Sequence, residues 1–168
     1  VAVVEESVDA VKGGAGELVG VALEKPLARN LAEARRLIEL TCNPALENFT
    51  LTKLLWVRKR EPQVWDKFRR LVLPKDYVRL RLTGEHAIDV ADASGTLLLD
   101  VANRRWSAEM LAAAHVDERC LPRLYESPEI CGQVSAEGAA NCGLRAGTPV
   151  VAGAGDQSAG AVGMGIVS

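Results

Sequence analysis

The sequence predicts an α/β fold. Short apolar runs alternate with segments whose apolar residues recur at helical spacing, and the tail reads as a strand, a tight glycine turn and a helix. Apolar residues make up 48% of the 168 residues and charged residues 25%, which is the ordinary composition of a globular protein. A chain of this length is long enough for one domain with a substantial core.

The first part of the chain predicts two helices around one strand. Apolar residues at helical spacing indicate a helix over residues 1–12, and the apolar run 18–23 indicates a buried strand. Asn30 can cap a second amphipathic helix over residues 31–40.

The next segment predicts two further helices and a strand. Residues 50–60 form an amphipathic pattern whose inward positions are Leu51, Leu54, Leu55 and Trp56. Pro62 suits the first turn of a helix over residues 63–70, and the apolar run 71–73 is a strand candidate.

The middle of the chain predicts a capped helix followed by a short turn and a strand. Pro74 opens a helix over residues 75–82, which Gly84 closes. Residues 88–93 indicate a short helical turn, and residues 96–101 indicate a strand after the break at Gly95.

Two serine-capped helices follow. Ser107 caps a helix over residues 108–115, and Pro122 and Pro128 bracket a loop. Residues 130–134 indicate a strand, and Ser135 caps a helix that runs to Cys142 and stops at Gly143.

The tail carries the first candidate for chemistry. The apolar run 149–152 meets the turn Gly153-Ala-Gly155, then Asp156, then a small-residue helix over residues 158–165. An acid at the carboxyl end of a strand, beside helix amides, lies where α/β proteins place their sites, so Asp156 is a candidate general base. The alternative interpretation is a helix N-cap aspartate, and the two roles are compatible. The glycines match neither a P-loop nor a dinucleotide fingerprint.

Composition and single residues exclude several classes. A net charge of −2 leaves no basic footprint for nucleic acid, and no apolar run has the length of a membrane span. No signal peptide is visible, and four cysteines without a Cys-x-x-Cys pair indicate free thiols in the cytoplasm rather than a metal site.

Asp89 and Asp92, three residues apart, are interpreted as a solvated pair on one helix face. His86 and His115, the only histidines, are each isolated in the sequence and are interpreted as structural or surface residues. The ends, Val1 and an apolar run before Ser168, indicate a piece of a longer protein.

Residues 150–163 resemble the catalytic-aspartate segment of the xylulokinases, a group within the FGGY carbohydrate kinase family. Further blocks agree with this family in order and spacing: residues 43–46, 53–57, 61–62, 73–84 and 89–106. The resemblance covers about residues 37–167. It implies a partial ribonuclease H-like domain of the actin-like ATPase superfamily, namely part of the N-terminal domain of a two-domain kinase.

The resemblance also implies an activity and site residues. The reaction is transfer of the γ-phosphate of ATP, accompanied by Mg2+, to the C5 hydroxyl of D-xylulose. Asp156 corresponds to the base that deprotonates that hydroxyl, Gln157 to a residue that helps hold the sugar, and Gly155, with Gly153, to residues that shape the sugar pocket.

The sequence departs from the family pattern in three places. No segment matches the Asp-x-Gly-Thr phosphate-binding hairpin. A stretch with the sugar-contacting Gln-Met-His segment and a Trp-Asn-Asp segment is deleted near residues 22–29, and the nucleotide-binding second domain is not represented. The expectation is that this chain alone does not turn over, and that exposed faces are buried against a second copy as a homodimer. The alternatives are an FGGY kinase for ribulose, glycerol or gluconate, and a non-catalytic truncated paralogue or interaction module.

Overall fold

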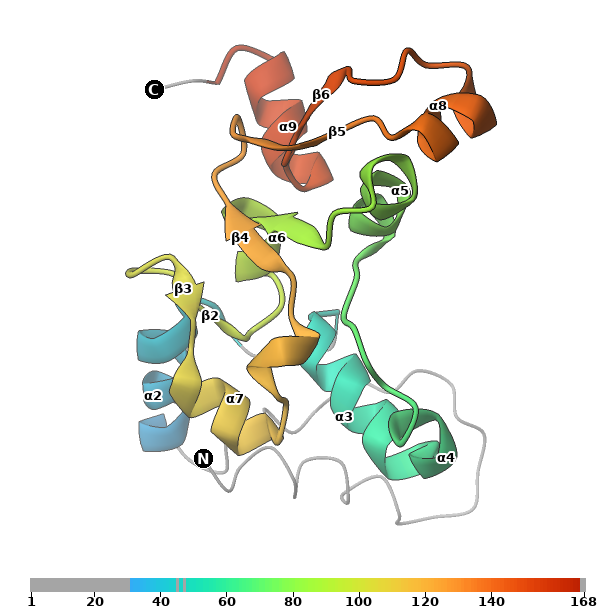
Figure 1. The fold of residues 1–168 in the computed structure, drawn as a ribbon. Helices are drawn as coiled ribbons and strands as arrows, with labels where there is room; N and C mark the ends of the chain where they lie inside the picture. Colours follow the sequence, from blue (N-terminus) through green and yellow to red (C-terminus); the bar gives the residue numbers. More distant parts are fainter. Residues whose placement is uncertain (1–30, 45, 47, 167–168) are drawn as a thin grey trace, which may run out of the picture. The chain divides into compact units, whose positions relative to one another are not determined.

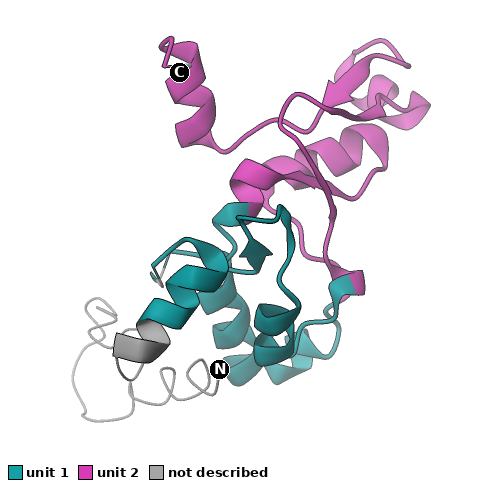
Figure 2. Cartoon of the chain, turned by 90° about the vertical axis from the view of Figure 1, so that its left-hand side faces the viewer, with its two compact units in different colours: residues 1–68, 94–118 teal, residues 69–93, 119–168 magenta. Residues whose placement is uncertain are grey.

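The computed structural model describes residues 31–166 apart from residues 45 and 47. The helix, strand and Asn30 cap predicted within residues 1–30 lie outside the described residues. The chain divides into two compact units, residues 1–68 with 94–118 and residues 69–93 with 119–168 (Figure 2).

The first unit is mainly helical. It contains α2 (Leu31–Thr41), α3 (Thr50–Arg60), α4 (Pro62–Trp65), α7 (Ala108–Ala114) and an antiparallel pair of short strands, β2 (Leu99–Asp100) and β3 (Arg105–Trp106) (Figure 1). Its core consists of aliphatic side chains from these elements and the turn before β2: Leu37, Leu51, Leu55, Leu97, Leu98, Leu99, Met110, Leu111 and Ala114.

Polar contacts fix the helices of this unit. Ser107 Oγ accepts a hydrogen bond from the Met110 amide at 3.3 Å, which confirms the predicted N-cap of α7. The guanidinium of Arg58 donates to the carbonyl of Ala114 at 2.7 Å, and so satisfies a carbonyl at the end of that helix.

The second unit combines helices with two strand pairs. Its elements are α5 (Pro74–Thr83), β1 (Ala87–Asp89), all but the last residue of α6 (Val90–Ser94), all but the first residue of the 3-10 turn η2 (Glu118–Cys120), β4 (Arg123–Tyr125), β5 (Ile130–Gln133), α8 (Ala136–Cys142), β6 (Pro149–Val151) and α9 (Asp156–Gly163). Strands β1 and β4 are parallel, with Ile88 opposite Leu124, and β5 and β6 are antiparallel, with Gly132 opposite Val150. Ala87, Cys131 and Ala152 form a small buried cluster. The predicted α/β class is confirmed.

Helix α8 packs against the end of α5 through a glycine. A Cβ on Gly138 would lie 2.2 Å from the carbonyl oxygen of Leu82, so only glycine fits there. The same carbonyl accepts hydrogen bonds from the amide and hydroxyl of Ser135, which also caps α8. The left-handed residues Gly84 and Gly143 end α5 and α8, as predicted.

Several predicted elements are wrong. Residues 71–73 form no strand, and the Leu71 amide bonds the Cys120 carbonyl instead. The strand over 96–101 shrinks to β2 because Leu97 has a φ of +61°, which breaks extended backbone. The helix over 63–70 ends at Trp65, where hydrogen bonds three residues apart replace helical ones.

Two further segments and one side chain differ from expectation. Residues 88–93 begin as strand β1 and only then turn into α6, and the loop between Pro122 and Pro128 contains β4. Both differences arise because β1 and β4 pair with each other, a long-range contact that local patterns do not report. Trp56, expected to point inward, is 52% exposed.

Candidate functional site

The candidate site centres on the turn between β6 and α9. Gly153 has a φ of +81°, a left-handed conformation that favours glycine, and Gly155 is the N-cap residue of α9. Asp156 is the first residue of the helix and is exposed. The N-cap aspartate interpretation is therefore wrong, because Gly155 occupies that position.

The carboxylate of Asp156 accepts a hydrogen bond from another of the predicted site residues. Gln157 Nε2 donates to Asp156 Oδ2 at 3.5 Å, and both side chains are exposed. Three predicted site residues, Gly155, Asp156 and Gln157, are thus consecutive at the start of α9. An exposed carboxylate there can accept a proton from a bound hydroxyl group.

Sequence reasoning missed a charged cluster next to this turn. Lys75 Nζ lies 2.6 Å from Asp76 Oδ1, 2.8 Å from Asp89 Oδ1 and 3.1 Å from Asp92 Oδ2. The side chains of Asp76 and Asp89 are fully buried, while Lys75 is 29% exposed. The solvated interpretation of Asp89 and Asp92 is wrong, because Lys75 is the third partner that the sequence pattern did not reveal.

Burial and ion pairing act in opposite directions on this cluster. Burial lowers the pKa of Lys75, but hydrogen bonds and charge from Asp76 and Asp89 outweigh it and raise the pKa above the ordinary lysine value. Burial raises the pKa of Asp76, against the opposing effect of Lys75 and Arg79. Asp76 Oδ2 is buried without a hydrogen-bond partner among the described residues.

A second cation ties the cluster to the strand that leads into the turn. Arg79 NH2 contacts Asp76 Oδ1 at 2.6 Å, and its guanidinium also donates to the carbonyls of Ala87 and Ala152. Ala87 begins β1, and Ala152 directly follows β6. Arg79 therefore joins α5 to both strands.

Asp92 touches the turn itself. A Cβ built on Gly155 would lie 3.1 Å from Asp92 Oδ1. The backbone of Gly155, with φ −61° and ψ 156°, is open to any residue, so space rather than conformation favours glycine here. Asp92 is held in turn by Lys75 and by its own amide, which donates to Asp89 Oδ2 at 2.8 Å.

The described part of the chain offers no metal centre. No group of three or more His, Cys, Asp and Glu side chains is placed to hold a metal ion among these residues. The three aspartates gather around the ammonium group of Lys75, which occupies the centre that a cation would need. These residues do not fit a resident Mg2+.

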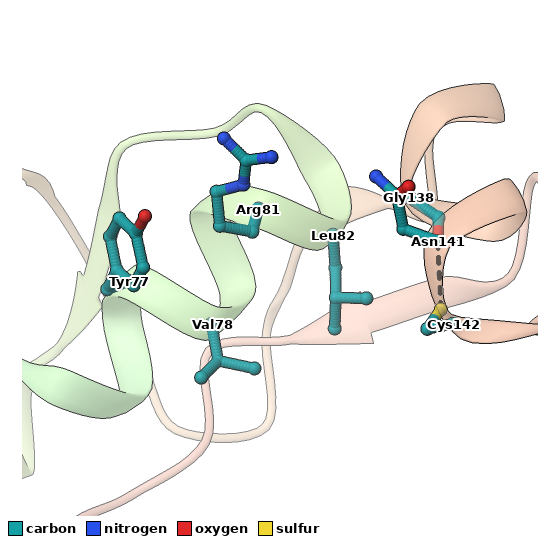
Figure 3. Close-up of a pocket in the computed structure, with 7 residues that line it drawn as sticks. All are labelled: Tyr77, Val78, Arg81, Leu82, Gly138, Asn141 and Cys142. Carbon is teal, nitrogen blue, oxygen red and sulfur yellow. Dashed lines mark hydrogen bonds between the residues drawn. The ribbon is translucent and has the colours of Figure 1, made fainter.

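A separate cavity of about 360 Å³ lies between α5 and α8 (Figure 3). Tyr77, Val78, Arg81, Leu82, Gly138, Asn141 and Cys142 line it. None of the turn residues 153–157 contributes to this lining, so the cavity is distinct from the candidate site. Among the described helices, none is both long and apolar enough to cross a membrane.

Comparison with known protein families identifies the family of this chain. Residues 24–163 match the N-terminal domain of the FGGY family of carbohydrate kinases. That match covers well over half of the chain, so the chain belongs to the FGGY family of carbohydrate kinases.

Within the family, the chain is similar to several xylulose kinases. The chain is 49% identical to xylulose kinase of Escherichia coli over 128 residues, which are 76% of this chain and 26% of that protein. It is 45% identical to xylulose kinase of Lactococcus lactis over 134 residues, 80% of this chain and 27% of that protein. The solved structure of a xylulose kinase from Brucella ovis superposes with a TM-score of 0.75 at 43% identity, over 80% of this chain and 28% of the other. The chain thus spans about a quarter of the length of these relatives.

Proposed function

We propose that this chain carries the sugar side of the phosphoryl-transfer site of a xylulose kinase. The supporting observation is the exposed carboxylate of Asp156, which begins α9 after a turn shaped by two glycines. The similarity to xylulose kinases supports D-xylulose as the sugar.

In the proposed reaction, Asp156 accepts the proton of the C5 hydroxyl of D-xylulose. The C5 oxygen forms a bond to the γ-phosphorus of ATP, the bond from that phosphorus to the β–γ bridging oxygen breaks, and ADP leaves with that oxygen. Gln157 holds a sugar hydroxyl, and Gly155, with Gly153, shapes the turn beside which the sugar binds. Mg2+ bound with ATP would supply charge neutralisation at the phosphates, and no group of three or more His, Cys, Asp and Glu side chains among the described residues is placed to hold it.

The 168-residue chain alone is not expected to turn over. Phosphoryl transfer depends on positioning and charge stabilisation, and this sequence contains no match to the phosphate-binding hairpin of the family. Asp156 and its neighbours can bind a sugar, but without the phosphate-binding hairpin they cannot align the sugar with ATP.

Calorimetric titration with D-xylulose tests this proposal. The expected result is binding by the wild-type chain that Asp156→Ala abolishes, with no sugar-dependent ADP release from ATP in a parallel assay. Glu137→Ala is a matched control because Glu137 is an exposed acid in the same unit, at the start of α8. A folded chain that does not bind sugar would favour the non-catalytic alternative, and binding of ribulose, glycerol or gluconate in preference would change the substrate.

A further inference from the structure

The turn that carries Asp156 is fixed at its start by three hydrogen bonds. The guanidinium of Arg79 donates to the Ala152 carbonyl. The Ala152 amide donates to the backbone carbonyl of Glu129 at 2.9 Å, and the Gly153 amide to the backbone carbonyl of Ser127 at 3.0 Å. Residues 152 and 153 are therefore firmly placed. The carbonyl of Gly155, which directly precedes Asp156, accepts a hydrogen bond from the Ala159 amide at 2.9 Å, and a side chain from outside α9 packs beside this residue.

The side chain beside Gly155 is that of Asp92. A Cβ added to Gly155 would lie 3.1 Å from Asp92 Oδ1. The position of Asp92 is restrained, because its Oδ2 forms an ion pair with Lys75 Nζ at 3.1 Å and its amide donates a hydrogen bond to Asp89 Oδ2. Lys75 is itself held by the two buried carboxylates of Asp76 and Asp89.

We propose that Lys75 and Asp92 are positioning residues that fix the backbone of Gly155 and thereby the carboxylate of Asp156. This inference rests on the proposed role of Asp156 as general base. A base must lie within hydrogen-bond reach of the proton it accepts, and a misplacement of about 1 Å can cost on the order of a hundredfold in rate. Neither Lys75 nor Asp92 needs to touch the sugar for this role.

Amide hydrogen exchange measures the positioning directly. The Ala159 amide donates to the Gly155 carbonyl at 2.9 Å, so its exchange rate reports whether Gly155 stays in place. We expect Asp92→Ala to speed exchange at Ala159 by on the order of tenfold. The Gly138 amide, which donates to Ser135 Oγ at 2.9 Å, should stay unchanged, and Glu137→Ala should affect neither amide.

Conservative variants distinguish the loss of a charge at Lys75 or Asp92 from a general loss of folded structure. Lys75→Met should reproduce the faster exchange at Ala159. Lys75→Arg should retain part of the protection, because it keeps a cation near the three carboxylates but places a larger, planar group there. Asp92→Asn keeps the volume of the side chain and should shift the amide resonances of Gly155 and Asp156 less than Asp92→Ala does.

A double-mutant cycle provides an independent test. Gly155→Ala should disturb the Asp156 amide resonance in the wild-type background but much less beside Asp92→Ala, because the contact partner is gone. Gly153→Ala should disturb it in both backgrounds, since the cause there is the positive φ.

Sugar binding separates failure of this inference from failure of the proposed function. Where the wild-type chain binds D-xylulose, Asp92→Ala should weaken binding by on the order of tenfold. Absence of sugar binding by the wild-type chain would overturn the proposed role of Asp156. Amide exchange at Ala159 and the double-mutant cycle would then still test whether Asp92 positions Gly155. Unchanged Ala159 exchange in Asp92→Ala, or equal effects of Gly155→Ala in both backgrounds, would overturn the positioning.

Discussion

Replacing Lys75 by methionine tests whether the charged cluster stabilises the second unit. Lys75 Nζ lies within 3.1 Å of three carboxylates, two of which belong to fully buried side chains. Methionine keeps much of the side-chain volume but removes the charge, and leaves Asp89 and Asp92 without their cation. Breaking a buried ion pair on one side costs about 3–5 kcal/mol. Because Lys75 is 29% exposed and Asp76 keeps Arg79, we expect the lower end, about 3 kcal/mol.

Urea unfolding followed by circular dichroism measures this change as a shift in the transition midpoint. The matched variant is Asp89→Asn, which removes the charge of one partner of Lys75. The double variant Lys75→Met with Asp89→Asn should lose less free energy of unfolding than the sum of the losses in the two single variants. A loss below about 0.5 kcal/mol for Lys75→Met would refute the reasoning, because that is the value of an exposed ion pair.

The pH dependence of this effect has a definite sign. The pKa of Lys75 is raised in the folded chain, so its contribution to stability is fully present below the ordinary lysine pKa of about 10.4 and is lost as pH rises through the folded value. The stability difference between wild type and Lys75→Met should therefore be constant from neutral pH to about pH 10 and shrink above it. A difference that shrinks near pH 7 would contradict the assignment to Lys75.

Three further predictions concern packing, capping and thiol reactivity. Gly138→Ala should destabilise the chain by about 2–3 kcal/mol in urea unfolding, because its Cβ would overlap the Leu82 carbonyl, whereas Ala139→Gly should cost only about 1 kcal/mol. Ser107→Ala and Ser135→Ala should each cost about 1 kcal/mol through loss of an N-cap, and no change in either midpoint would contradict the capping geometry. Burial raises the pKa of Cys131, so mass spectrometry after mild alkylation at pH 8 should show modified Cys42 and Cys142, which are exposed, before Cys131.

Elements with their own local signals could be predicted from the sequence. Serine at 107 and 135 and glycine at 84 and 143 mark the ends of α7, α8 and α5, because caps and left-handed residues act within a few positions. The small-residue tail likewise indicated strand, turn and helix, and the helix begins with Asp156.

Elements that depend on distant partners could not be predicted in this way. Strands β1 and β4 are three residues each and form through mutual pairing between residues 87–89 and 123–125. The cluster of Lys75 with Asp89 and Asp92 could not be predicted for the same reason, since α5 meets β1 and α6 only in the folded chain. The sequence does show an acid, Asp89, directly after the apolar pair Ala87 and Ile88, and the structure buries that pair.

The central claim is that D-xylulose binds at the turn before α9. Nuclear magnetic resonance of the 15N-labelled chain during titration with D-xylulose tests it most directly, because glycine amides at 153 and 155 give separate reporters. The claim predicts saturable shifts at residues 153–157 that vanish in Asp156→Ala. Shifts confined to the cavity lined by Tyr77 and Gly138, or none in a folded chain, would contradict it.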